Sequence, residues 1–377
     1  MRSRRLFLGS FPKHKVPLFN TFSLFRRIFF IWILVLFLPG KVFAASDHAG
    51  LKDAKAEVCF KCHKDLGKLA DSSEAHPPFA SGECTSCHEL QGDTFKFTAE
   101  GNALCYTCHA DKEEDVSKKK HVHGAVEMAG CAGCHSPHGT ENKHQLLKTP
   151  PELCYGCHSD KEEYVKQVKY PHGAMDAKGS CAACHDPHAS DFDKLLKAEE
   201  NMELCLKCHG RVRKASQGYV MNMKRWLMDN PERHGPILTG DCAACHNPHG
   251  SNNWRMLLRK AFPSTFYTPF KVEEYSLCFE CHDQSLALEK KTTSATGFRN
   301  GDKNLHYVHV NDPRKGRRCV VCHNIHATKG PRHIRESTKF GNWEIPIHFE
   351  INENGGRCAP GCHFPRAYHR SEAVKNR

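Results

Sequence analysis

One short motif dominates this sequence, because it accounts for every cysteine in the chain. Eleven copies use all 22 cysteines of the 377 residues. Ten copies read Cys-x-x-Cys-His, and they are Cys59/Cys62/His63, Cys84/Cys87/His88, Cys105/Cys108/His109, Cys131/Cys134/His135, Cys154/Cys157/His158, Cys181/Cys184/His185, Cys205/Cys208/His209, Cys242/Cys245/His246, Cys278/Cys281/His282 and Cys319/Cys322/His323. The eleventh, Cys358/Cys362/His363, has one additional residue between its cysteines. All thiols in the chain therefore share one repeated task.

Two thiols followed at once by a histidine form the attachment pattern of c-type haem. The thiols bond covalently to the cofactor, and the adjacent histidine becomes the proximal ligand of the iron. Zinc sites usually take their thiolates from two separated pairs. Disulfides within Cys-x-x-Cys suit redox catalysts, and eleven such sites would each need a separate purpose. The motifs therefore predict eleven covalently bound haem c groups, ten on Cys-x-x-Cys-His and one on Cys-x-x-x-Cys-His.

The supply of apolar residues is small for a chain of this length. Hydrophobic residues make up 39% of the chain, and there are only four tryptophans. The 333 residues that follow residue 44 leave about 30 residues for each motif, which is too few to bury each haem separately. We therefore expect an elongated, mainly irregular multihaem fold with short α-helices, little or no β-sheet, and a core of packed haems. The charged segments 111–120 and 160–169 are expected to be short helices, and 211–229 a longer one.

The motifs are arranged in repeats, each of which holds two of them. A typical repeat has a histidine upstream, the first motif, a second histidine three residues later, a pair of leucines, and then the second motif. After an N-terminal segment with one motif (45–75), we divide the chain into a degenerate repeat A (76–120), repeats B (121–170), C (171–230) and D (231–300), and repeat E (301–377), which ends with the widened motif.

A second axial ligand would complete each haem iron, and the repeats offer histidines for this role. Nine recurrent candidates are His76, His123, His172, His234 and His309, upstream of the first motifs, and His138, His188, His249 and His326, three residues after them. His48 and His121 complete a set of eleven, and His306, His348 and His369 are the alternatives to these two. Three residues span only about 10 Å, so a histidine in the second group is not expected to reach around its own haem. We expect it to bind a neighbouring haem, most simply the partner in the same repeat.

Repeat A departs from the pattern at one position. Gln91 stands where the other repeats have the histidine that follows the first motif. We therefore expect the haem on Cys105/Cys108 to lack its recurrent ligand. The next repeat begins with two histidines, His121 and His123, and His121 is expected to fill the vacancy. The alternatives are an open haem, or closure by His48 or by a histidine near the C-terminus.

The first 44 residues have the order of a secretory signal. Eight basic and no acidic residues occur there, with a basic stretch, an apolar run at 28–38, and small residues that end at Ala44. This predicts a signal peptide at 1–44 that is cleaved after Ala44. An uncleaved anchor and a twin-arginine signal at Arg4-Arg5 are the alternatives. Without this segment the formal charge falls from +12 to +4, so we expect no nucleic-acid partner.

The repeated motifs resemble those of multihaem cytochromes c built from doubled Cys-x-x-Cys-His modules, such as periplasmic pentahaem and decahaem cytochromes. The resemblance implies an electron carrier of anaerobic respiration or extracellular electron transfer, without catalytic residues. It implies a periplasmic location, or one associated with the outer membrane or outside the cell. The expected partners are a quinol-linked donor of the inner membrane and a terminal reductase or outer-membrane conduit, in association with a membrane complex. The alternative is a multihaem oxidoreductase, acting on nitrite, hydroxylamine or tetrathionate, with one open haem.

Overall fold

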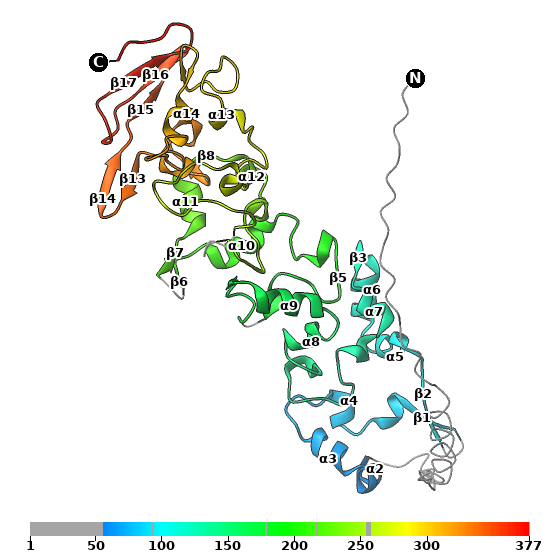
Figure 1. The fold of residues 1–377 in the computed structure, drawn as a ribbon. Coiled ribbons are helices and arrows are strands. Elements are labelled where there is room, and N and C mark those ends of the chain that lie inside the picture. Colours follow the sequence, from blue (N-terminus) through cyan, green and yellow to red (C-terminus); the bar gives the residue numbers. More distant parts are fainter. Residues whose placement is uncertain (1–55, 92–93, 178, 216–217, 254–257, 377) are drawn as a thin grey trace, which may run out of the picture. The chain divides into compact units, whose positions relative to one another are not determined.

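The computed structural model describes residues 56–91, 94–177, 179–215, 218–253 and 258–376 (Figure 1). The expected signal peptide, its cleavage site and His48 lie outside these residues. Within them, no helix combines the length and the apolar character needed to cross a membrane. The described residues divide into two parts, a smaller one of residues 88–91 and 94–96 and a larger one that holds the other described residues.

The described residues of the smaller part form a two-stranded ribbon. Strand β1 (His88–Gln91) pairs with strand β2 (Thr94–Phe97), whose last residue belongs to the larger part. The ring of His88 lies 6.2 Å from that of Phe95 and nearly perpendicular to it. His88, a motif histidine, is therefore held at the start of this ribbon.

Short helices carry most of the larger part. The α-helices are α2 (Ala56–Cys62), α3 (Lys64–Ala70), α4 (Pro77–Ala80), α5 (Asn102–Tyr106), α6 (Ala110–Lys118), α7 (Gly124–Met128), α8 (Glu152–Tyr155), α9 (Ser159–Gln167), α10 (Asn201–His209), α11 (Met223–Asp229), α12 (Gly235–Leu238), α13 (Ser285–Leu288) and α14 (Leu305–Val310). The 3₁₀ turns are η1 (Cys84–Ser86), η2 (Cys131–Gly133), η3 (Lys143–Gln145), η4 (Ser180–Ala183), η5 (Asp193–Leu195), η6 (Cys242–Ala244), η7 (Val272–Tyr275), η8 (Cys319–Val321) and η9 (Pro331–His333). The first motif of every repeat therefore begins in or next to a 3₁₀ turn.

Two of the three helices expected from charged segments are confirmed, as α6 and α9. Acidic residues fill their first turns and lysines their last turns, which suits the helix dipole. In α9, Glu162 also accepts a hydrogen bond from Lys166 one turn later, at 2.6 Å. The long helix expected at 211–229 is wrong. A ribbon of β6 (Arg213–Lys214) and β7 (Tyr219–Val220) interrupts it, and α11 begins only at Met223.

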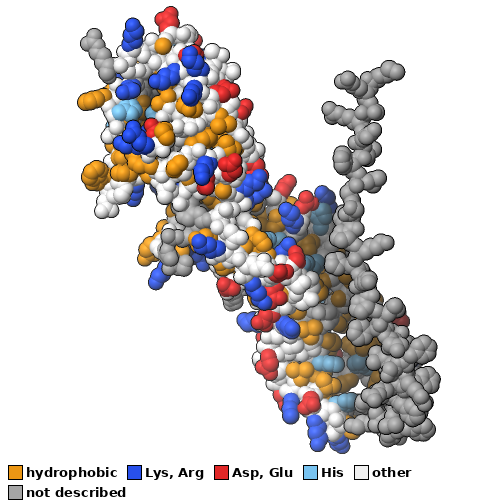
Figure 2. Space-filling model, viewed as in Figure 1, with side chains coloured by type: hydrophobic (Ala, Val, Ile, Leu, Met, Phe, Trp, Pro, Cys, Tyr) orange, Lys and Arg blue, Asp and Glu red, His pale blue; other side chains and the backbone are white. Residues whose placement is uncertain are grey.

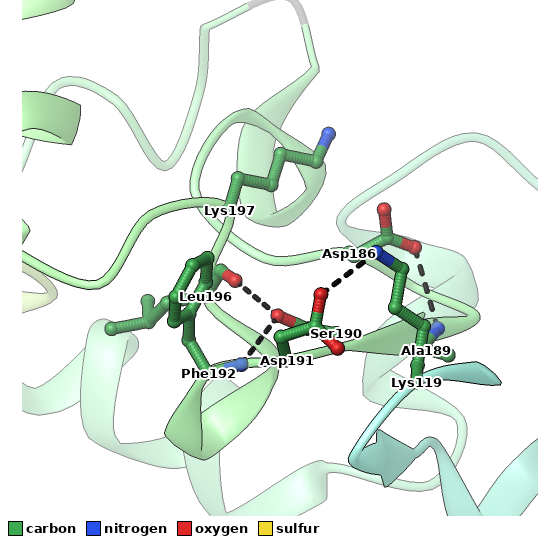
Figure 3. Close-up of a pocket in the computed structure, with 8 residues that line it drawn as sticks. All are labelled: Lys119, Asp186, Ala189, Ser190, Asp191, Phe192, Leu196 and Lys197. Carbon is green, nitrogen blue, oxygen red and sulfur yellow. Dashed lines mark hydrogen bonds and ion pairs between the residues drawn. The ribbon is translucent and has the colours of Figure 1, made fainter. Parts of the chain in front are cut away.

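The remaining strands are short, and three ladders of two residue pairs connect consecutive repeats. The ladders join β3 (His121–Val122) to β5 (Ala189–Ser190), β4 (Tyr170–Pro171) to β9 (Gly250–Ser251), and β8 (Glu232–Arg233) to β12 (Ala327–Thr328). Each ladder aligns the strand next to the upstream histidine of one repeat with the strand that follows the later histidine of the next. Figure 3 shows the surroundings of the β3–β5 ladder. Lys119 Nζ lies 2.9 Å from Asp191 Oδ2, and Ser190 Oγ donates to the carbonyl of Leu196.

Repeat E ends in longer strands than repeats B, C and D. Beyond the β10–β11 ribbon (Arg299–Asn300 and Lys303–Asn304), β13 (Ser337–Phe340) pairs with β14 (Trp343–Pro346). A three-stranded antiparallel sheet follows, in the order β15 (Phe349–Ile351), β16 (Gly355–Cys358) and β17 (Arg366–His369). The widened motif starts at the last residue of β16, so this sheet positions Cys358.

Apolar clusters are few among the described residues. One cluster has Leu227, Ile237 and Ala327 at its centre, with Trp226 packed against it. The other has Tyr275, Ala287 and Val310, with Phe270 and Phe279 packed against them. Both lie after residue 200. In the described residues before it, the buried hydrophobic side chains are Ala56, Phe79, Val168, Met175, Ala189 and Ala198, and most of these are small.

Candidate haem-binding sites

The second motif of every repeat has a histidine facing its own. In each case the facing histidine is the upstream histidine of the same repeat, and the two rings are roughly parallel. The ring centres are 6.0–6.3 Å apart in the pairs His76–His109, His123–His158, His172–His209, His234–His282 and His309–His363. His76 therefore faces the motif of Cys105/Cys108. The expectation that this motif lacks its recurrent histidine is wrong.

The first motifs of repeats B, C and D are faced by histidines from the following repeat. The pairs are His135–His188, His185–His249 and His246–His326, with ring centres 6.1–6.3 Å apart and interplanar angles of 6–19°. The expected pairing within one repeat is therefore wrong for these histidines. The physical reason is the ladder between repeats, which lays the segment after each first motif against the preceding repeat.

Repeat E is the last repeat, and it supplies both histidines of its first pair. His306 lies 6.3 Å from His323, with an angle of 23° between the rings. His306 and His309 both lie on α14, three residues apart, and therefore on neighbouring positions of one helix face. One short helix thus serves both motifs of the repeat.

The separation of the paired rings fits an iron atom between them. A metal–imidazole bond is about 2.0 Å long, and each ring nitrogen is about 1.1 Å from its ring centre when ring bonds are about 1.35 Å. Two such ligands on one iron therefore place their ring centres about 6.2 Å apart. All nine pairs fall within 0.2 Å of this value, between 6.0 and 6.3 Å.

Hydrogen bonds hold several of these rings by the other nitrogen. In the first motifs, Nδ1 of His135, His185 and His323 donates to the carbonyl oxygens of His144, Lys194 and Arg332, at 2.7–3.0 Å. Each of these three acceptor residues has a positive φ of 58–59°, a costly conformation for a residue with a side chain. The turn directs its carbonyl at the ring. Since Nδ1 carries the proton, Nε2 keeps its lone pair for a metal.

The upstream histidines of repeats B and C are held in a related way, by the next repeat. Nδ1 of His123 donates to the carbonyl of Pro187 at 2.8 Å, and Nδ1 of His172 to that of Pro248 at 2.7 Å. Each of these prolines immediately precedes the facing histidine of another site. One contact between consecutive repeats therefore positions two histidines, the upstream histidine of one repeat and the histidine that follows the first motif of the next.

Burial favours the neutral, metal-binding form of several of the paired imidazoles. It lowers the pKa of His306 to about 3 and that of His326 to about 4, with smaller contributions from neighbouring histidines. Burial also lowers the pKa values of His188 and His249. These rings are unprotonated at neutral pH.

The cysteines of consecutive motifs are neighbours in space. First cysteines of adjoining motifs form hydrogen-bonded thiol pairs, namely Cys59 with Cys84, Cys105 with Cys131, Cys154 with Cys181, Cys205 with Cys242, and Cys278 with Cys319. Second cysteines interact electrostatically across the alternate intervals, as Cys87 with Cys108, Cys134 with Cys157, Cys184 with Cys208, Cys245 with Cys281, and Cys322 with Cys362. All 22 thiols are outside disulfides. The order of the motifs in sequence is therefore also their order in space.

The remaining candidate ligands of haem iron are not among the nine facing pairs. His121 lies in β3 opposite Ser190, and its Nε2 is 3.3 Å from Oδ1 of Asp193, so the nine pairs do not include it. The ring of His138 lies 4.8 Å from that of Phe79. His63 precedes α3 as its cap residue. His121 therefore does not occupy the place that the sequence predicted for it.

Sequence reasoning missed a recurrent hydroxyl in the first-motif loops of repeats B to E. Five residues after the motif histidine, the hydroxyls of Thr140, Ser190 and Ser251 donate to the carbonyls of Leu146, Leu196 and Leu258. Thr328 holds the same position in repeat E and donates to Gly330. The signal was present in the sequence as a serine or threonine at one fixed offset. These hydroxyls close the loop whose turn supports the motif histidine.

Paired cysteines beside paired histidines at this separation define a binding protein for c-type haem. The family described as the doubled CXXCH motif matches residues 76–114, 123–163, 172–214 and 234–287. The multiheme cytochrome MtrA of Shewanella baltica is 28% identical over 189 residues, which cover 46% of this chain and 53% of that protein. The high-molecular-weight cytochrome c of Nitratidesulfovibrio vulgaris is 22% identical over 352 residues, or 87% of this chain and 55% of that protein.

These matches and the motifs identify the chain as a multihaem c-type cytochrome, with covalently bound haem. The chain spans about half the length of the two relatives.

Proposed function

We propose that this protein relays electrons between redox partners along eleven covalently bound haems, each held between two axial ligands. The observation that carries the proposal is the set of nine histidine pairs at 6.0–6.3 Å, each containing one motif histidine. Bound haem supplies an iron that alternates between the ferric and ferrous states. For the motifs of His63 and His88, the proposal rests on the sequence alone.

The proposed ligand set follows the ring geometry rather than the sequence order of the histidines. The motif histidines are the proximal ligands. The facing histidines are the distal ones, and His306 replaces His121 among them. Two imidazoles on one iron leave no position for a substrate, which suits a carrier. The carbonyl groups that accept from Nδ1 fix each ring and raise its basicity as a ligand.

The path of the relay is proposed to follow the sequence. Consecutive motifs are linked alternately by hydrogen bonds between their first cysteines and by electrostatic interactions between their second cysteines, from Cys59 to Cys362. Because no motif is bypassed in this series, an electron that enters near one terminal motif passes every other site before it leaves. The chain contributes spacing, ligands and exclusion of water, and no single side chain carries out a reaction.

The proposed location is the periplasm, or another compartment outside the cytoplasmic membrane. The support is the signal-like order of residues 1–44 and the need for covalent haem attachment, which in this reading takes place on the exported, unfolded chain. The proposed partners are a quinol-linked donor of the inner membrane and a terminal reductase or outer-membrane conduit. Their identities would be determined by the surfaces around the terminal motifs.

A reductase is the second candidate function, and one observation says where to look for it. The pair His309–His363 has the largest interplanar angle of the nine, 36°, and it belongs to the widened motif. An enzyme would need one displaceable ligand, and this site is the first place to search for it.

Anaerobic titration of the reduced protein with carbon monoxide tests the proposal, because the gas binds five-coordinate ferrous haem. We expect less than one reactive haem in a protein whose intact mass shows eleven haem additions. Reactivity equal to one haem or more would contradict the relay and support the reductase. An intact mass with ten additions would remove the Cys358/Cys362 motif from the relay.

A further inference from the structure

An aromatic surface lies beside the widened motif at the end of the chain. Phe364 directly follows His363, and its side chain is 86% exposed. Trp343 is 73% exposed, and Phe340 lies opposite it in the β13–β14 ribbon. Single exposed aromatic side chains are ordinary, but several that gather at one place mark an interaction site. We call Phe340, Trp343, Phe364 and Arg366 the terminal patch.

The loop of the widened motif packs against β14. The backbone nitrogen of Gly361 donates to the carbonyl of Pro346 at 3.0 Å, and a Cβ on Gly361 would lie 3.2 Å from Cγ2 of Ile345. Ile345 and Trp343 are two residues apart on a strand, so their side chains share one face. The face of β14 that carries Trp343 is therefore the face that meets the motif.

The same region is strongly basic. Arg366 lies opposite Cys358 in the β16–β17 pair, and Arg366 and Arg317 are close enough to His309 for their charges to act on its ring. Residues 313–377 contain 13 basic and five acidic residues. Two ferric haems with ionised propionates would lower this net charge of +8 by about two units only. Figure 2 shows hydrophobic and basic side chains intermixed over the part of the molecule that carries β13 to β17.

We propose that the terminal patch is the docking site of an acidic redox protein, which exchanges electrons with the chain at the Cys358/Cys362 motif. This inference rests on the proposed relay. The excess of positive charge would steer an acidic partner and orient it. The exposed rings would act as its anchors, since aromatic side chains dominate the binding energy of interfaces. Direct contact would occur beside the ligand His363.

The test is a binding experiment with the haem-loaded protein and two probes of opposite charge. Titration calorimetry at low ionic strength measures the affinity for an acidic flavodoxin and for a basic monohaem cytochrome c. The variants are W343A/F364A and R366E, which change exposed side chains only. The matched control is R213E/Y219A on the β6–β7 ribbon, where Tyr219 is 76% exposed.

We expect flavodoxin to bind more tightly than the cytochrome. The aromatic double variant should raise the Kd about tenfold or more, and the charge reversal should weaken the dependence of the Kd on salt. The control variant should bind flavodoxin like the parent protein. Flavodoxin binding that survives both patch variants, or tighter binding of the basic probe, would overturn the proposal.

Self-association is a distinct outcome, because residues 55–200 have an acidic excess, with 24 acidic and 17 basic residues. Sedimentation of the protein alone would reveal dimers or filaments, and their loss in the patch variants would assign the patch to a second copy and overturn the acidic-partner proposal. The carbon monoxide titration is independent of both results. If it finds an open haem while flavodoxin still binds at the patch, the relay fails and the docking site stands.

Discussion

Residues 55–200 and residues 201–377 carry the same motif but surround it with different amounts of protein. First cysteines are 23–27 residues apart between Cys105 and Cys205, and 36–41 residues apart from Cys205 to Cys358. Both apolar clusters lie in the later stretch. The earlier stretch is held by ladders of two residue pairs and by the histidines that its repeats exchange. The stability of residues 55–200 should therefore depend more strongly on bound haem than that of residues 201–377.

The two stretches also differ in charge. The first has 17 basic and 24 acidic residues, and the second has 28 basic and 16 acidic residues. Six motifs lie in the first and five in the second. If each ferric haem adds about −1, the difference in sign persists in the loaded protein, at about −13 and about +7. One repeated architecture thus presents opposite charges near its two ends.

Loss of haem should separate the two stretches most clearly. In protein freed of haem, peptides from 56–200 should exchange their amide hydrogens at the rate of an unfolded chain, because few apolar contacts remain there. Peptides around Leu227 and Tyr275 should retain protection. Hydrogen–deuterium exchange with mass spectrometry measures this. Equal exchange across both stretches would show that the apolar clusters do not fold without haem.

Removal of a single distal histidine distinguishes the geometry of repeat E from the sequence pattern. H306A should make one of the eleven haems reactive to carbon monoxide, since His306 faces His323 at 6.3 Å. H121A is the matched control and should leave the reactivity unchanged, because His121 lies against Asp193. The reverse result in the difference spectra would restore the assignment that the sequence suggested.

The apolar clusters can be tested by creating a cavity. L227A should lower the free energy of unfolding by about 2–4 kcal/mol, through lost burial and the space left behind. Leu147, in the earlier stretch, is 47% exposed, so L147A should cost less than about 1 kcal/mol. Denaturant unfolding, followed by tryptophan fluorescence, compares the two. Equal losses would mean that Leu227 is not part of a stabilising core.

The loop hydroxyls should give the smallest effect. S190A removes the bond from Ser190 to the Leu196 carbonyl and leaves the Phe192 amide without its acceptor, at a cost of about 1–2 kcal/mol. Ser117 is exposed and bonds within α6, so S117A is the control and should be nearly neutral. Thermal unfolding of both variants measures the difference. A neutral S190A would show that the loop does not need its hydroxyl.

Local features of this protein could be predicted from its sequence. The motifs specify their chemistry within five or six residues, and α6 and α9 follow from acidic and basic residues one turn apart. The segment 211–229 misled the prediction, because its apolar residues suggested one helix. Gly218 has a φ of +80°, and it turns the chain between β6 and β7. A glycine within a periodic segment was the signal for this break.

The pairing of distant histidines could not be read in the same way. His188 could reach either of two neighbouring sites, and only the β3–β5 ladder selects His135 of the preceding repeat. His306 was predicted only as a substitute for His48 or His121, because the other repeats use one upstream histidine, whereas α14 presents two. Contacts between residues that are far apart in the sequence decide the partners of both His188 and His306. The signal peptide and the haem count of eleven stay predictions of the sequence.

The central claim, that the histidine pairs hold the irons in sequence order, can be tested by locating the irons themselves. Anomalous scattering at the iron edge from crystals of the haem-loaded protein would give their positions. We predict an iron midway between the rings of each of the nine pairs, with neighbouring irons belonging to consecutive motifs. An iron that lies away from its pair, or one bound by His121 instead of a facing histidine, would contradict the account.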